Sequence, residues 1–401
     1  MHIRVATLNT WGLPEPLSRQ PEQRMRSIGA RLPGLSLDVI AFQEVWTAGV
    51  RRRLRRAGRE AGLVHAWGPD ARIGGSGLLL LSRWPILASQ LTAFSLRGHP
   101  ERLTHGDYYG KKGYAWLRLA TPAGPISVID THLHARYASD VSHEYVPQRV
   151  GQVVQLALGT QSISEPLIAA GDFNFTDRHV EHGLLSDLTG LRDVARETGN
   201  AQATVLHTNP LRNSQKPDRR VDYVFARDGE HARVVTRSVR RIFDGPVPQP
   251  AGAYSDHAGV LADLEILPAQ RPIPAWTAPP EAIERARQLL AQGRSAARHR
   301  RSDGRIVTGA GLGFATLVAV GRRKLPAASR RGFLRVGLQA AALLALTPSI
   351  GGSVLSEVFA PNEIRAYENL SLALERLQPR GPSRVAEDLA QVRGGPPAPR
   401  P

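Results

Sequence analysis

The sequence predicts an α+β sandwich of mostly antiparallel sheets in roughly its first 267 residues, followed by a C-terminal region of different character. In the first region, short apolar runs rich in β-branched residues alternate with helical stretches and with turns of Gly, Pro and Asp. Neighbouring runs such as 114–131, joined across Pro122-Ala123-Gly124, are typical of β-hairpins. Strands paired in hairpins, with helices set apart from them, indicate an α+β architecture.

The elements are expected where these patterns change along the chain. Strands are predicted at the apolar runs 3–8, 39–43, 77–82, 114–120, 126–131, 167–170, 221–226 and 260–264. Helices are predicted at the amphipathic stretches 20–32, 47–61 and 143–158, and a short one at 280–292. The domain organisation predicted is a catalytic domain (1–267), a Pro-rich linker (268–280), a basic region with two apolar helical segments (281–377) and a disordered tail (378–401).

Composition limits the chemistry that the chain can perform. Its 401 residues suffice for one large domain of about 250 residues and an appendage. It contains no cysteine, which excludes disulfides and thiolate metal sites and favours hard oxygen ligands over those of zinc. The N-terminus begins directly on an apolar strand without a basic segment before it, so we expect no secretory signal.

The strong positive charge is concentrated in one part of the chain. The formal net charge is +17, but residues 285–335 hold 13 Lys and Arg against the single acid Asp303, a net +12. The predicted catalytic region is therefore only mildly basic, which weakens a duplex-binding interpretation.

Polar residues follow or precede several of the predicted strands, where core packing holds side chains rigidly. Gly171-Asp172-Phe173-Asn174 follows the run 166–170, and Ser255-Asp256-His257 precedes 258–264. Asn9 and Glu44 stand at the ends of the first two strands. Carboxylate and amide oxygens that converge with His and Asp predict Mg²⁺-assisted attack on a phosphate ester.

The residue types suggest which of these groups bind the metal, orient the reactants and transfer the proton. Glu44 is expected to be the principal Mg²⁺ ligand, with Asn9 completing the site directly or through water, although Glu44 could instead cap the helix that follows. Asp172 and Asn174 are two residues apart and are expected to share one face of an extended segment, where the carboxylate orients water or metal and the amide donates to a phosphate oxygen. A simple turn is the alternative there. His257 is predicted to be the general base.

The order of these blocks along roughly residues 1–266 resembles the endonuclease/exonuclease/phosphatase superfamily. The resembling blocks are Leu8–Trp11, Phe42–Glu44, Gly171–Asn174, Arg220–Tyr223 and Ser255–His257. The resemblance implies a four-layered α/β sandwich, with two mostly antiparallel sheets flanked by helices. It also implies that Asp222 holds the tautomer of His257 and that Asp256 is a second metal or water ligand.

Within the superfamily, the chain is most similar to membrane-type neutral sphingomyelinases. The similar segments are Thr131–Ala135 with Tyr137 and Gln148-Arg149, Gly75–Leu78 with Ser82 and Pro85-Ile86, His105–Gly113, and Thr189–Asp193. The resemblance implies that His132 stabilises charge on the phosphoryl oxygen. It also implies that Lys112 approaches the substrate phosphate and that pairing with Asp107 holds the loop in one state, the alternative being a solvated surface pair. His134 is expected either to line the pocket or to pack.

The C-terminal region contains two apolar segments, 306–321 and 332–359, separated by basic residues from Arg322 to Arg331. This pattern predicts either a membrane hairpin with its loop on the cytoplasmic side or an interfacial anchor on anionic lipid. Helices packed on the catalytic domain are the alternative. We therefore expect a membrane-associated protein at the cytoplasmic face.

The function expected is that of a Mg²⁺-dependent phosphodiesterase of phospholipase C type, with Mn²⁺ as a substitute metal. Its substrate is expected to be sphingomyelin or a related phospholipid at a bilayer surface. The alternatives are a nuclease of the same superfamily, acting on DNA or RNA, and an inactive membrane-tethered scaffold. The location of the basic residues in the tail disfavours nucleic acid as the partner.

Overall fold

The computed structural model describes residues 1–69, 75–102, 104–137, 145–212, 216–324 and 333–377. Its centre is a pair of six-stranded sheets. The first sheet contains, in spatial order, β11 (Ala232–Ile242), β12 (Gly259–Pro268), β1 (His2–Asn9), β2 (Val39–Gln43), β4 (Leu79–Ser82) and β3 (His65–Trp67). The second contains β5 (Ile86–Ala93), β6 (Gly113–Thr121), β7 (Gly124–His132), β8 (Leu167–Asp172), β10 (Asp222–Arg227) and β9 (Arg192–Asp193).

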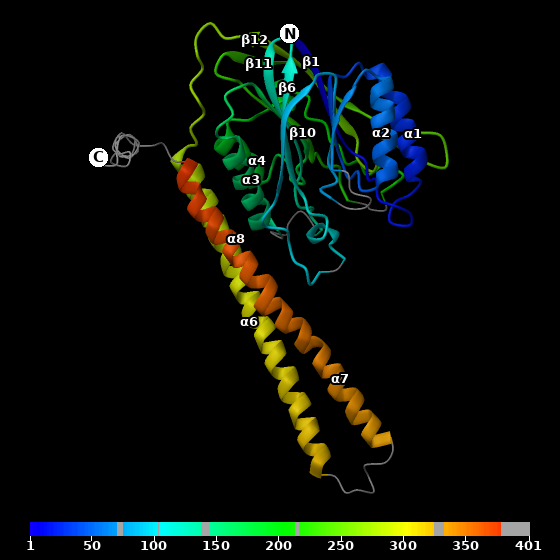
Figure 1. Cartoon of the computed structure of the whole chain (residues 1–401), viewed down its shortest axis with the longest axis vertical. Coiled ribbons are helices and arrows are strands. Elements are labelled where there is room, and N and C mark those ends of the chain that lie inside the picture. Colours follow the sequence, from blue (N-terminus) through cyan, green and yellow to red (C-terminus); the bar gives the residue numbers. More distant parts are fainter. Residues whose placement is uncertain (70–74, 103, 138–144, 213–215, 325–332, 378–401) are drawn as a thin grey trace, which may run out of the picture.

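Helices cover the outer faces of both sheets and complete four layers (Figure 1). The first sheet carries α1 (Pro21–Arg31), the single turn η1 (Pro33–Leu35) and α2 (Ala48–Glu60), and the second carries α3 (Val146–Thr160) and α4 (Val180–Thr189). The short α5 (Val194–Glu197) contacts β10 and β11 and packs into the core between the two sheets. Among the strands of the described residues, β1–β2 and β7–β8 pair in parallel and the other ladders are antiparallel. The predicted α+β sandwich is confirmed.

Every predicted strand and helix of the catalytic region is present, but strands β3, β5, β9 and β11 and helices α4 and α5 were not predicted. β5 and β11 are edge strands with mostly exposed side chains, so their sequences lack the apolar run that reveals a buried strand. The first residues of the predicted helix 143–158 lie outside the described residues, and α3 begins at Val146.

Beyond the sandwich, the chain forms a long helical hairpin that extends away from the sheets (Figure 1). α6 (Pro280–Lys324) is followed by α7 (Phe333–Val354), the π turn η4 (Leu355–Phe359), α8 (Ala360–Ala373) and the turn η5 (Leu374–Leu377). The predicted end of a short helix near Gln292 is wrong. α6 continues for 45 residues because no proline interrupts 281–325.

The two halves of the hairpin have different surroundings. Near the sandwich, Ile283 and Leu290 of α6 and Tyr367 of α8 are buried in the same core cluster as the inner faces of α3 and α4. Farther out, Leu317 and Leu344 are 73% and 74% exposed. The core of the second sheet therefore continues into the C-terminal region, and the division at residue 267 stays a prediction.

Two helical stretches, 280–321 and 340–377, are long and apolar enough to cross a membrane, judged by length and composition. Each holds an 18-residue window of mean hydropathy 1.4, and only 6% and 18% of these windows is buried. A core helix of a soluble protein would be mostly buried, so the exposure of these windows favours contact with lipid. The basic loop 325–332 and the tail 378–401 lie outside the described residues.

Candidate active site

The polar residues singled out in the sequence meet at one edge of the sandwich, because strand direction brings their strand ends together. Asn9 ends β1 and Glu44 follows β2, its parallel neighbour. Asp172 at the end of β8 lies directly opposite Asp222 at the start of the antiparallel β10. His257 precedes β12, which runs antiparallel to β1. The two sheets thus bring these side chains together at one edge of the sandwich.

Asn9 joins the two sheets at this edge. Its amide nitrogen donates to Glu44 Oε1 at 3.1 Å and to Asp172 Oδ2 at 3.0 Å, while its oxygen accepts from the backbone of Trp11 at 3.0 Å. This last contact fixes which way the amide points. In this arrangement Asn9 positions two carboxylates relative to each other.

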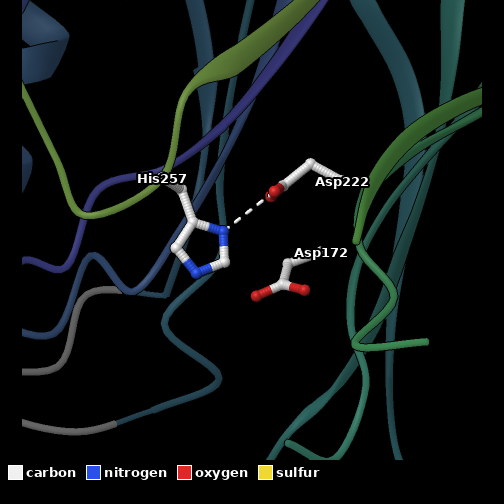
Figure 2. A group of neighbouring side chains, drawn as sticks. All are labelled: Asp172, Asp222 and His257. Atoms are coloured by element: carbon white, nitrogen blue, oxygen red, sulfur yellow. Dashed lines mark hydrogen bonds and ion pairs between the residues drawn. The ribbon is translucent and has the colours of Figure 1, made fainter. Parts of the chain in front are cut away.

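His257 and Asp222 form a buried hydrogen-bonded pair (Figure 2). Nδ1 of His257 lies 2.8 Å from Asp222 Oδ2, which leaves Nε2 on the opposite side of the ring. Burial disfavours the charged ring, but the contact with Asp222 outweighs it, and the pKa of His257 is raised to about 10. Asp222 is held in turn by Thr204, whose hydroxyl accepts from the Asp222 amide at 3.3 Å.

Asp172 is the central carboxylate of the site. Burial opposes its ionisation, but the neighbouring His132 and His257 hold its pKa below the ordinary value. Its Oδ1 accepts from the amide of Asn174 at 3.0 Å. Asn174 has a φ of 53°, so the expectation that Asp172 and Asn174 share one face of an extended segment is wrong. The chain turns there because an Asp side chain readily accepts from the backbone amide two residues on. The side-chain amide of Asn174 in turn donates to the Leu133 carbonyl at 3.0 Å.

Lys112 and Asp107 form a buried ion pair beside Asp172. Lys112 Nζ donates to Asp107 Oδ1 at 2.7 Å and to the Leu133 carbonyl at 3.0 Å, and it lies 2.8 Å from His132 Nε2, which accepts a proton only in the tautomer protonated at Nδ1. Burial would raise the pKa of Asp107, yet Lys112 brings it down to about 2. The two side chains are only 6% and 11% exposed, and the alternative of a solvated surface pair is therefore wrong.

His132 lies between Lys112 and Asp172, with its Nε2 3.3 Å from Asp172 Oδ2. His134, two residues on, packs behind the ion pair: its ring stacks on that of Tyr145 with centroids 4.1 Å apart. Burial lowers the pKa of His134 to about 4, so the ring is neutral at physiological pH. Of the two expectations for His134, the structure shows packing.

Glu44 and Asp256 suit a hard divalent cation. Burial raises the pKa of Asp256, and the negative charge of the nearby Glu44 raises it further. Two carboxylates that oppose each other's ionisation are stabilised when a cation lies between them. Asp172, Asp222 and His257 also offer ligand atoms within 4.8 Å of one another. That cluster fits a cation less well, since His257 is already bonded to Asp222 through a shared proton.

Arg24 supports the site and was not predicted. Its side chain is fully buried on α1 and donates to the carbonyls of Thr10 and Trp11, each at 2.7 Å, and of Tyr254 at 3.2 Å. The guanidinium therefore ties the segment after Asn9 to the one before Asp256. The signal in the sequence is a charged residue on the buried stripe of a helix, beside Met25.

A two-sheet sandwich with a His–Asp pair and clustered carboxylates at one edge defines a phosphoesterase of the metal-dependent class. The chain matches the Endonuclease/Exonuclease/phosphatase family over residues 6–257, and it belongs to that family.

Curated relatives are similar over the catalytic region and, in one case, over nearly the whole chain. The "Putative neutral sphingomyelinase" of Drosophila melanogaster is 29% identical over 66% of this chain, a match that spans 61% of the fly protein. "Sphingomyelin phosphodiesterase 2" of Homo sapiens is 28% identical over 97% of this chain and 94% of its own length. That second alignment includes the hairpin.

Among solved structures, sphingomyelinase C from Streptomyces griseocarneus superposes with a TM-score of 0.50 at 18% identity, covering 66% of this chain and 99% of the other. At this identity the likeness supports the fold alone. It confirms the four-layered sandwich and leaves the hairpin outside the superposed part.

Proposed function

We propose that the protein is a Mg²⁺-dependent phosphodiesterase of phospholipase C type that hydrolyses sphingomyelin or a related phospholipid. The observation that carries the proposal is the His257–Asp222 pair, placed across Asp172 from the Lys112–His132 pair. A base on one side of a phosphodiester and hydrogen-bond donors on the other, among them the cationic Lys112, are the groups that hydrolysis by water needs.

His257 is proposed to accept the proton of the attacking water at Nε2, with Asp222 fixing the ring through Nδ1. His132 and Lys112 are proposed to donate to the phosphoryl oxygens as negative charge develops there. Lys112 Nζ already contacts Asp107, His132 and the Leu133 carbonyl. To bind a phosphate oxygen, it must give up one of these three contacts. The amide of Asn174 would likewise leave the Leu133 carbonyl to reach the phosphate.

Glu44 and Asp256 are proposed to hold the cation, with Asn9 orienting Glu44. When bound there, Mg²⁺ would supply positive charge against the phosphate oxygens and the attacking water. Mn²⁺, which accepts the same oxygen ligands, is expected to substitute. Asp172 accepts a hydrogen bond from Asn9, so it links the proposed cation ligands to the neighbouring His257–Asp222 pair.

The outer half of the hairpin is proposed to anchor the enzyme in an anionic bilayer. The uncharged stretch of α6, 306–321, lies between Arg305 and Arg322 and is about 24 Å long, shorter than the roughly 30 Å of hydrocarbon that a spanning helix crosses. The basic residues from Arg322 to Arg331 favour a cytoplasmic position for the loop. If the hairpin spans, the catalytic domain lies on the opposite face from the loop; if it lies within one leaflet, both share the cytoplasmic face.

Nucleic-acid hydrolysis is the competing function, and an inactive scaffold is the second. The experiment that separates them incubates the purified protein with liposomes containing sphingomyelin and with plasmid DNA, in Mg²⁺ or in EDTA. We expect Mg²⁺-dependent release of the phosphorylated headgroup and intact plasmid. Plasmid cleavage without headgroup release would establish a nuclease, and no product from either substrate would favour the scaffold.

A further inference from the structure

A cavity of about 460 Å³ lies where the hairpin leaves the catalytic domain. One wall is made by Pro100 and Glu101, which precede the short helical turn η2 (Gly106–Tyr108). The other wall comes from the hairpin and includes Val307, Gly351 and Phe359. The volume falls in the range of about 300–1,000 Å³ that is typical of ligand pockets.

The walls of this cavity suit an apolar ligand that arrives from the hairpin side. Val307, Val354, Leu355 and Phe359 supply hydrocarbon surface, and both valines remain exposed. The exposed apolar surface continues outward along α6. The carboxylates of Glu101 and Asp303 also line the cavity, but most of its exposed lining is hydrocarbon. A hydrocarbon chain bound there would be removed from water and remain in contact with apolar atoms.

Charged residues next to the cavity on the hairpin indicate where the bilayer surface would lie. Arg305 Nε is 2.8 Å from Glu357 Oε1, and Arg301 lies 3.4 Å from the same carboxylate. Outward from these pairs, the side chains described on α6 as far as Gly321 are uncharged, as a segment immersed in lipid requires. With the hairpin anchored as proposed, the cavity would lie at the boundary between headgroups and acyl chains.

The cavity also shares its walls with the loop that carries Asp107. The ring of Phe359 meets Tyr108 edge-on, with centroids 5.6 Å apart, and the Tyr109 hydroxyl donates to the Pro100 carbonyl at 3.1 Å. Tyr108 follows Asp107, the partner of Lys112. The cavity wall and Lys112, which is proposed to receive the phosphate, are therefore joined by a short run of contacts through Tyr108 and Asp107.

We propose that this cavity is a subsite for an acyl chain of the substrate lipid, which holds the chain while the headgroup occupies the active site. The proposal rests on the proposed function and names the part of the substrate that the hairpin recognises. It predicts discrimination by chain length, because a short chain cannot fill the cavity while its phosphate lies between His257 and Lys112.

Gly351 allows the cavity to be filled without disturbing the fold. Gly351 lines the cavity, and a Cβ added there meets no atom within 4 Å, so Gly351→Phe adds an aromatic ring at the cavity wall without a clash at Cβ. Gly309→Phe is the matched control, since Gly309 lies in an equally open position on α6 and does not line the cavity. Both variants are made in the full chain, and Val354→Asn serves as a second cavity variant if Gly351→Phe is unstable.

The first readout is kcat/KM in mixed micelles for sphingomyelin with a long or a short acyl chain. We expect Gly351→Phe to lower the long-chain value about tenfold and to leave the short-chain value within about twofold. Gly309→Phe should leave both unchanged. Equal losses on both substrates, or none in either cavity variant, would overturn the proposal.

The second readout does not require turnover. A sphingomyelin with a photoreactive group at the end of its acyl chain is cross-linked in EDTA, and the labelled peptides are mapped. We expect label within 351–359 in the wild type and in Gly309→Phe but not in Gly351→Phe, with competition by long-chain sphingomyelin. Label that persists in Gly351→Phe, or that resists competition, would contradict the subsite. Label without hydrolysis under any condition would instead defeat the proposed function and leave the subsite standing.

Discussion

His257 holds the proton that a general base must first lose. Its pKa is raised to about 10 by Asp222, with Asp256 and Asp172 adding to the effect. An imidazole in that state is protonated at neutral pH and cannot accept a proton from water. A dication held by Glu44 and Asp256 would offset the surrounding carboxylates and lower this pKa.

The first prediction follows from that argument. Titration of the His257 ring by NMR should give a pKa near 10 in EDTA and a value closer to neutrality in Mg²⁺. In Asp222→Asn the value in EDTA should fall, because the main source of the upward shift is lost. If Mg²⁺ leaves the pKa of His257 unchanged, the bound cation does not control the protonation of the proposed base.

The buried Asp107–Lys112 pair gives the second prediction. The pKa of Asp107 is lowered from 3.8 to about 2, so its ionised form stabilises the fold above about pH 4, and this contribution is lost as the pH falls through 3.8 towards 2. Lys112→Met leaves a buried carboxylate without its cation. We expect the variant to lose about 2 kcal/mol of unfolding free energy at pH 7 and less below pH 4. Thermal unfolding measured between pH 3 and 7 checks this, and a loss independent of pH would contradict it.

The sequence predicted the site residues because they stand at strand ends in recognisable blocks, and these residues do meet in space. What it could not supply were the contacts that depend on tertiary packing. The bridge from Asn9 to Glu44 and Asp172 joins two sheets, and the turn at Asn174 depends on the carbonyl of Leu133. Neither has a local signature, since both need partners distant in the chain.

At the level of elements, buried strands were predicted better than edges. β8 is apolar up to Asp172 and buried throughout, whereas β11 carries four arginines among its 11 residues and lies at a sheet edge. The length of α6 was missed because the glycines and arginines after Gln292 weaken the helical pattern. Packing compensates for them: a Cβ at Gly293 would lie 2.4 Å from the ring of Tyr367, so the glycine lets α6 and α8 approach closely.

Helix α1 gives the third prediction, through Arg24. Because the guanidinium holds three carbonyls on two segments at the cation site, Arg24→Lys keeps the charge but loses the fork of donors. We expect about a tenfold weaker apparent affinity for Mn²⁺ with a fold that is retained. Calorimetric Mn²⁺ titration of the wild type and the variant measures it. As a control, Arg26→Lys alters an exposed side chain of the same helix and should bind Mn²⁺ like the wild type.

For the whole molecule, the inner half of the hairpin is part of the folded core, and the outer half is the part proposed to bind the membrane. The inner half shares the core of the second sheet, so removing everything after residue 267 would remove Leu290 and expose its partners on α3. The outer half can be removed more cleanly, since Thr308 Oγ1 donates to the Ser349 carbonyl at 3.1 Å and brings α6 and α7 together at that point.

The fourth prediction uses this contact between Thr308 of α6 and Ser349 of α7. Replacing 309–348 by a turn of about four residues should leave a folded protein that no longer sediments with membranes. Such a variant should hydrolyse sphingomyelin dispersed in detergent and lose most of its activity on intact vesicles, because anchoring raises the local concentration of substrate. Sedimentation and headgroup release, measured on the same samples, test it. Vesicle activity equal to that of the full chain would exclude an anchoring role.

The most direct test of the central claim measures the products of the full-length protein on sphingomyelin in mixed micelles. With Mg²⁺ we expect phosphocholine and ceramide in equal amounts and no phosphocholine in EDTA, with little rescue by Ca²⁺, whose looser coordination positions the reactants less well. Glu44→Gln and His257→Asn should each lower the rate by at least about 10²-fold while the folded core is retained. Nucleotides released from single-stranded DNA under the same conditions, without phosphocholine from sphingomyelin, would contradict the account.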